Sequence, residues 1–251
     1  MTPAAATPRV RDLLRSAADG ALQVLHVGRE AVYVEVSGWC VGVVGPRAAQ
    51  VPCALRVRDV HHLGEVLAGG PAAAYVGGGK LHVGGTPLPI GRLVGAYVPP
   101  LDREATHRTS PVTVEATPPA TVAGFVASHL PGRRVEAGTA AHLLGRGEGL
   151  TPLGDDLLAG WLAMHRAVGV PTPEVDAVVA TARRRTTLLS ATLLDCALRG
   201  EVLPEYAGWV RQVGRAAESA AVRALHAVGG TSGAGLHAGG VIALEQLREA
   251  A

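Results

Sequence analysis

The hydrophobic pattern changes character part of the way along this chain. Over residues 20–98 the apolar stretches are short, rich in valine and broken by glycine. Such runs predict β-strands. Glycine-containing breaks at residues 28–30, 37–38 and 77–79 predict hairpin turns. The expected strands cover residues 22–27, 31–36, 39–44, 54–57, 73–76, 80–83 and 92–98.

After residue 119 the spacing of apolar positions becomes typical of helices. The expected helices cover residues 120–130, 134–144, 155–168, 173–184, 187–199, 205–227 and 234–250. Gly169, Gly200 and Gly229 stand where helix C-termini favour glycine. In the first half, we expect only two short helices, over residues 7–18 and 59–67.

Proline separates the two regions. Residues 99–119 contain five prolines with polar residues between them, which predicts a linker or a long crossover. We therefore expect an α+β protein. A β-rich domain over residues 1–98, barrel-like or sandwich-like with a leading helix, would be followed by a helical domain over residues 120–251.

One glycine-rich segment stands out in the helical half: Gly145-Arg-Gly-Glu-Gly-Leu-Thr-Pro-Leu-Gly-Asp-Asp156. Glycines let the backbone approach a ligand, and a helix start offers N–H groups to an anion. Asp155 and Asp156 are good helix caps but would repel a bare anion. A cation such as Mg²⁺, held by the two carboxylates, would let the aspartates and an anion share the site. The alternative is an ordinary turn in which Thr151 or Asp155 caps the helix.

A second segment, residues 231–239, reads like a shorter copy of residues 151–160. Gly233 aligns with Gly154, and Gly235 replaces Asp156. The two elements could face each other across one pocket, or they could be helix starts that pack closely through small residues. His237 lies within this segment; it could carry protons in such a pocket or serve only the core.

A third segment, residues 183–190, places three arginines ahead of hydroxyl side chains. Guanidinium groups bind planar anions through paired hydrogen bonds, so this segment suits an anionic group. A solvated basic turn is the simpler alternative.

Three blocks resemble the signature motifs of the AllH family: Gly149-Leu-Thr-Pro-x-Gly-Asp-Asp156, Arg185-Thr-Thr-x-x-Ser190 and Gly230-Thr-Ser-Gly-Ala234. The named member of that family is a subunit of oxamate carbamoyltransferase, which acts in anaerobic allantoin breakdown. The resemblance runs from about His142 to the end of the chain. The chain departs from the family pattern at three positions: Leu153 stands where serine is usual, Gly230 where histidine is usual and Gly235 where aspartate is usual.

The resemblance implies a subunit of a carbamoyltransferase in purine degradation, acting on oxamate or a related small amide. Its partners would be other subunits and a small anion, namely phosphate, carbamoyl phosphate or an oxamate-like acid. We expect Asp155, Asp156 and Arg185 to be catalytic, with Mg²⁺ held by the two aspartates. The residues expected to contact substrate are Gly147, Gly149, Thr151, Gly154, Thr186, Thr187, Ser190, Thr231, Ser232 and Gly233.

Two other functions stay open. The missing histidine and aspartate favour a non-catalytic subunit that docks partners. The aspartate pair would instead suit a stand-alone, metal-assisted amide hydrolase.

Composition limits the other classes of partner. A net charge of +2 and an aromatic content of 3% oppose nucleic-acid binding. No apolar run is long enough to span a bilayer, and no signal pattern precedes residue 19, so we expect the cytoplasm. The three cysteines are far apart in the sequence, which is typical of buried thiols in a reducing compartment.

Overall fold

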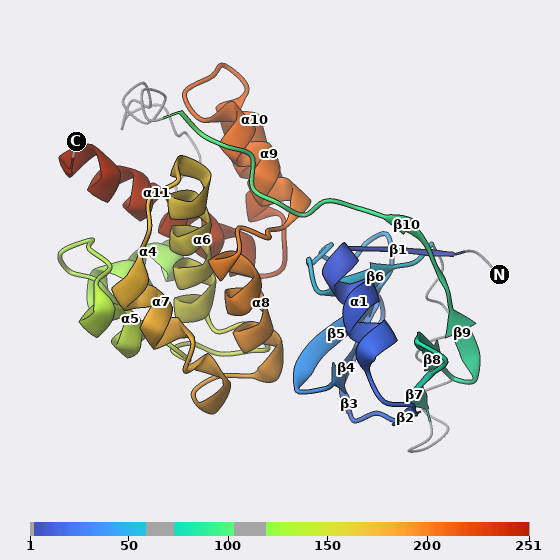
Figure 1. Cartoon of the computed structure of the whole chain (residues 1–251). Helices are drawn as coiled ribbons and strands as arrows, with labels where there is room; N and C mark the ends of the chain where they lie inside the picture. The colour runs from blue at the N-terminus through green and yellow to red at the C-terminus, as the bar shows by residue number, and fades with distance from the viewer. Residues whose placement is uncertain (1–2, 59–72, 103–118, 251) are drawn as a thin grey trace. The chain divides into compact units, whose positions relative to one another are not determined.

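The computed structural model describes residues 3–58, 73–102 and 119–250 (Figure 1). The chain divides into two compact units, Met1–Gly95 and Ala96–Ala251. Helices make up 45% of the structure and strands 19%, with the sheets in the first unit and most helices in the second. The α+β class is therefore confirmed. The helix expected over residues 59–67 and most of the proline-rich segment lie outside the described residues.

A mixed six-stranded sheet forms the centre of the first unit. Its strand order is β10-β1-β6-β5-β4-β3. Strand β5 is buried at every position, as its run of Val and other apolar residues favours. The strands are β1 (Ala4–Ala6), β3 (Val24–Val27), β4 (Ala31–Val36), β5 (Trp39–Val44), β6 (Ala54–Arg56) and β10 (Ile90–Leu93).

A second, four-stranded sheet has the order β2-β7-β8-β9. Its strands are β2 (Gly20–Ala21), β7 (Ala74–Gly77), β8 (Lys80–Val83) and β9 (Thr86–Leu88). The hairpin turns fall where expected: Ser37 and Gly38, and likewise Gly78 and Gly79, have the positive φ of tight hairpins. Within the described residues neither sheet closes on itself, so the barrel alternative was wrong.

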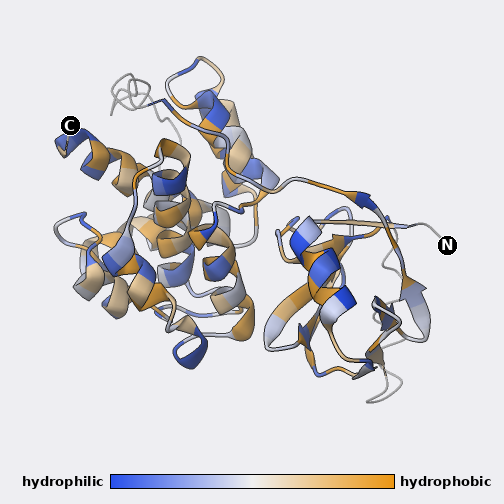
Figure 2. Ribbon diagram, in the orientation of Figure 1, coloured by the Kyte–Doolittle hydropathy of each residue, from blue (hydrophilic) through white to orange (hydrophobic). Residues whose placement is uncertain are grey.

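Helix α1 (Pro8–Ser16) packs in the first unit through one apolar stripe. Thr7 caps its start by accepting a hydrogen bond from the Val10 amide, and a proline occupies the first turn. Val10 and Leu14, four residues apart, are buried, while several other residues of the helix are hydrophilic (Figure 2). The amphipathic helix expected over residues 7–18 is thus present.

The second unit begins with an extended segment and is otherwise built from helices. These are α4 (Ala120–His129), α5 (Ala137–Leu143), α6 (Leu153–Val168), α7 (Pro173–Val179), a short 3₁₀ turn η1 (Ala182–Arg184), α8 (Leu188–Leu198), α9 (Pro204–Gln212), α10 (Glu218–His226) and α11 (Ser232–Glu249). The single helix expected over residues 205–227 is two helices. Gly214, with a φ of 70°, interrupts it, and its amide donates a hydrogen bond to Glu218 at the start of α10. Residues 96–98, expected as the end of a strand, hydrogen-bond instead to the segment after α8.

Helix α6 is the centre of the helical unit. Every residue of it is buried except Arg166 and Val168, as expected for a helix that is apolar nearly all the way round. Gly169 ends it in the left-handed conformation. None of the helices in the described residues is long and apolar enough to cross a membrane.

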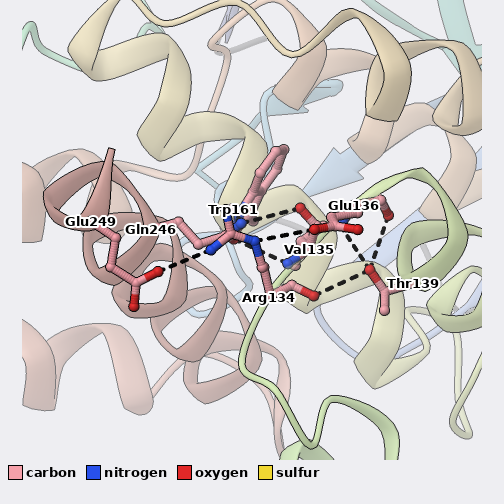
Figure 3. Close-up of polar contacts among 7 residues, drawn as sticks. All are labelled: Arg134, Val135, Glu136, Thr139, Trp161, Gln246 and Glu249. Carbon is pink, nitrogen blue, oxygen red and sulfur yellow. Dashed lines mark hydrogen bonds and ion pairs between the residues drawn. The ribbon is translucent and has the colours of Figure 1, made fainter. Parts of the chain in front are cut away.

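A polar cluster fastens the later part of α11 to the rest of the unit (Figure 3). The side-chain oxygen of Gln246 accepts hydrogen bonds from the Trp161 indole N–H at 2.7 Å and from the Val135 amide at 3.0 Å. Arg134 pairs with Glu249 close by. Because each buried polar atom of Gln246 finds a partner, the cluster fixes the segment ahead of α5 against α6 and α11.

Candidate functional site

Asp155 is the point where two of the three predicted segments, residues 145–156 and 183–190, are joined. Its side chain is only 1% exposed. The Gly145 amide donates to Oδ1 at 2.7 Å, and the hydroxyls of Ser190 and Thr186 donate to Oδ2 at 2.7 Å and 2.5 Å. The structure therefore brings the glycine-rich loop, the start of α6 and the start of α8 together around one carboxylate.

The environment of Asp155 contains opposing electrostatic effects. Burial raises the pKa of its carboxyl group, while the bonds from Gly145, Thr186 and Ser190 and the positive charge of Arg185 oppose that rise. Both oxygens already accept hydrogen bonds. Asp155 is thus positioned to hold the framework rather than to reach a ligand.

Thr187 contributes to the same framework. Its hydroxyl oxygen accepts a hydrogen bond from the Ser190 amide, as an N-cap of α8 does, and the hydroxyl donates to the carbonyl of Leu150 in the glycine-rich loop. The hydroxyls of Thr186, Thr187 and Ser190, expected to contact substrate, thus all bond within the protein. Arg185 lies at the end of η1 with its side chain exposed.

Asp156 has a different environment from its neighbour. It is 5% exposed, and its Oδ2 atom has no hydrogen-bond partner. Burial, with a smaller contribution from the charge of Asp155, raises the pKa of the Asp156 carboxyl to about 8. The hydroxyls of Ser232 and Thr151 act in the opposite direction and lower this pKa. At neutral pH this carboxyl therefore carries a proton.

The starts of α6 and α11 meet beside Asp156. The hydroxyls of Thr151 and Ser232 lie 2.9 Å apart. Neither helix has a side-chain cap: Pro152 and Thr231 occupy the cap positions, so the alternative in which Thr151 or Asp155 caps α6 was wrong. Two helix starts with their partial positive charge thus lie next to one another.

Glycines account for the close approach of these helices. A Cβ atom on Gly160 of α6 would lie 2.0 Å from the Leu236 carbonyl of α11, and one on Gly239 of α11 would lie 1.9 Å from the Leu157 carbonyl of α6. Gly160 and Gly239, like Leu157 and Leu236, are aligned positions of the two similar segments. The contact is therefore reciprocal.

The similarity extends to the preceding helices. The Gly154 amide bonds to the Arg146 carbonyl at 2.8 Å, and the Gly233 amide to the Val228 carbonyl at 3.0 Å. A Cβ on either glycine would collide with the last turn of the helix before it, α5 or α10. The helix pairs α5–α6 and α10–α11 thus repeat one unit, and Gly154 and Gly233, expected to contact substrate, serve packing.

The glycine-rich loop itself is exposed. Gly147 and Gly149 have φ values of 115° and 90°, which only glycine adopts easily. Gly145, with a φ of 75°, lies against the Arg185 carbonyl, where a Cβ would be 2.2 Å from the oxygen. Sequence reasoning treated Gly145 only as part of the loop and missed the hydrogen bond that its amide donates to Asp155. The spacing of the glycines was the one feature of the sequence that could have indicated this bond.

Two of the family-pattern departures touch one another. A Cβ on Gly235 would lie 2.7 Å from Cδ1 of Leu153 and 3.0 Å from Cβ of Asp156. Leu153 thus fills the space in which a side chain at position 235 would begin.

His237 lies elsewhere in the helical core. Its Nδ1 is 3.0 Å from Nε2 of His226, and its ring meets the Trp209 ring edge-on. Burial, helped by His226, lowers the pKa of His237 to about 3, so the ring is neutral. These contacts with α9 and α10 match the core role rather than the proton-carrying one.

The residues present fit Mg²⁺ poorly. Both oxygens of Asp155 already accept hydrogen bonds from within the protein. Among the residues that the structure describes, no group of three or more His, Cys, Asp or Glu side chains could hold a metal ion.

Comparison with known proteins bears on the same part of the chain. A family model described as oxamate carbamoyltransferase subunit AllH matches residues 143–244. That span runs from the end of α5 into α11 and contains all three motifs. No curated protein and no solved structure matches the chain. The match confirms the resemblance seen in the motifs and supports the assignment of this protein to the AllH family.

Proposed function

We propose that the chain is a subunit of a carbamoyltransferase that acts on oxamate or a related small amide, and that the starts of α6 and α11 form its anion site. The family match supports the first part. One observation carries the second: a buried carboxyl oxygen, Oδ2 of Asp156, lies without a partner at the meeting point of two uncapped helix starts.

The chemistry of carbamoyl transfer fits these groups. Phosphate and oxamate are anions, and attack on a carbamoyl carbon forms a tetrahedral intermediate whose oxygen becomes negative. Helix starts, hydroxyls and Arg185 would stabilise such charges. The protonated Asp156 would not repel them, and the charge of Asp155 is already balanced by three hydrogen bonds and by Arg185.

A family of subunits implies protein partners. The rival function, a non-catalytic docking subunit, is favoured by Gly230 and Gly235, because neither offers the side-chain donor or acceptor that the family pattern has there. The rival metal-assisted hydrolase is less favoured, since the aspartate pair fits a metal poorly.

The test is to purify the protein with and without co-expressed neighbouring gene products. Carbamoyl phosphate formation and the calorimetric binding of phosphate, oxamate and carbamoyl phosphate would then be measured. The variant Arg185→Ala should weaken binding roughly tenfold, as loss of a charge-assisted hydrogen bond does. Arg184→Ala, an exposed arginine on the same turn, is the matched control and should change little. If no anion binds even with the partners present, the docking subunit becomes the better account.

A further inference from the structure

We propose that the adjacent aspartates have separate roles: Asp155 holds the framework of the site, and Asp156 binds the substrate as an uncharged carboxyl group that donates a hydrogen bond from Oδ2. This inference rests on the proposed anion site and names the chemistry by which that site recognises its ligand.

The role of Asp155 follows from its hydrogen bonds. Three donors converge on its two oxygens: one from the glycine-rich loop, one just ahead of α8 and one from the first turn of α8. A buried carboxylate that accepts several hydrogen bonds is a stable, charged junction. Reaching a ligand would require Asp155 to release the loop or the start of α8.

The role of Asp156 follows from a count of protons. Thr151 and Ser232 have one hydroxyl proton each, and one of these is used in the bond between the two oxygens. At most one is left to donate to Asp156. A charged carboxylate has about four acceptor sites, so ionised Asp156 would be buried with most of them unfilled, which is costly.

A neutral Asp156 satisfies this geometry. One carboxyl oxygen can accept the remaining hydroxyl proton, while the other carries the acid proton and lacks an acceptor within the protein. The missing partner is thus an acceptor oxygen. The charge that acts on Asp156 is that of Asp155, and Arg185 acts in turn on Asp155. Because Asp156 is uncharged, it adds no negative charge to the site.

The ligand that fits is a small anion with an exposed acceptor oxygen, such as a carboxylate beside a carbonyl or an inorganic phosphate. The helix starts attract its charge, and Asp156 donates to its oxygen. Binding of this kind needs the acid proton, so affinity should fall once the pH exceeds the pKa of Asp156, by up to tenfold for each pH unit. Chelation of divalent cations should leave it unchanged.

The experiment compares Asp156→Asn with Asp156→Ala in the complete protein together with its partner subunits. An asparagine amide can donate as the neutral acid does but cannot ionise, whereas alanine cannot donate. Calorimetric titration of oxamate and of phosphate from pH 6 to 9, with EDTA or with Mg²⁺, gives the affinities, and thermal melts show that each variant is folded.

We expect Asp156→Asn to bind within about threefold of the wild type at pH 6.5 and to lose the pH dependence, and Asp156→Ala to bind roughly tenfold more weakly. If the wild type binds but both variants are equally weak, or if binding requires Mg²⁺, Asp156 acts as an ionised group and the inference is overturned. If the wild type binds neither anion, it is the proposed anion site that has failed. Infrared difference spectra between the wild type and Asp156→Asn at pH 7 then decide the protonation of Asp156. If the two proteins show the same protonated carboxyl bands, Asp156 is ionised at pH 7 and its neutral state is overturned as well.

Discussion

Replacing Asp156 by asparagine should remove a specific pH dependence from the stability of this protein. The carboxyl pKa rises from 3.8 in the unfolded chain to about 8 in the folded one, chiefly through burial. Between those two values the folded protein keeps a proton that the unfolded chain has released. The stability that the Asp156 carboxyl confers relative to an asparagine is therefore fully present below about pH 4 and is lost progressively as the pH rises toward 8.

The size of the effect follows from the two pKa values. Each unit of difference corresponds to about 1.4 kcal/mol, so the wild type should lose at most about 6 kcal/mol of unfolding free energy relative to Asp156→Asn between pH 4 and pH 8. Above pH 8 the difference should be constant. Because both proteins share every other titrating group, their difference isolates this one carboxyl.

Urea unfolding at one-unit steps from pH 4 to pH 9 measures the difference directly. Glu148→Gln is the matched control, since that side chain is exposed in the same segment ahead of α6. The reasoning is refuted if the curves for the wild type and Asp156→Asn run parallel over the whole range. Asp156 would then have the same pKa in the folded and in the unfolded protein, and it would be ionised at pH 7.

Three further variants test the packing and hydrogen bonding of the helical unit. Asp155→Ala leaves three donors, one buried and two partly buried, without an acceptor and should cost about 3 kcal/mol of unfolding free energy in urea titrations. A loss below about 1 kcal/mol would mean that the bonds contribute little. The lowered pKa of His237 makes the wild type lose unfolding free energy as the pH falls from about 6.5 toward 3, so His237→Phe should lose less over this range. The same dependence of stability on pH below 6.5 in both proteins would contradict this. Gly160→Ala puts a Cβ against a backbone carbonyl and should lower stability by about 2 kcal/mol or more, whereas Gly208→Ala on α9, with open space around it, should be neutral or gain up to about 1 kcal/mol; equal effects would argue against the close contact of α6 and α11.

Sequence reasoning located most elements because their local signals agree with the fold. The strands at residues 31–36 and 39–44 have β-branched runs and a glycine turn, and both begin and end as expected. Strand β1 was missed because its three alanines have no preference for a strand; it forms by pairing with β6 and β10. Such pairing over a long sequence distance leaves no local signal.

The candidate site was predictable as a set of segments but not as a set of roles. The motifs identified the loops that meet at Asp155, yet they gave Asp155 and Asp156 the same metal-binding role. Neighbouring residues of a helix point about 100° apart. One side chain therefore meets donors from the loop and α8, while the other meets the start of α11. Only the tertiary arrangement distinguishes them.

The contact between Leu153 and Gly235 couples the side chains at two helix starts. A Cβ atom at position 235 would lie 2.7 Å from Cδ1 of Leu153, so any larger residue there requires the leucine side chain to move. The effects of substitutions at positions 153 and 235 on stability should therefore not be additive.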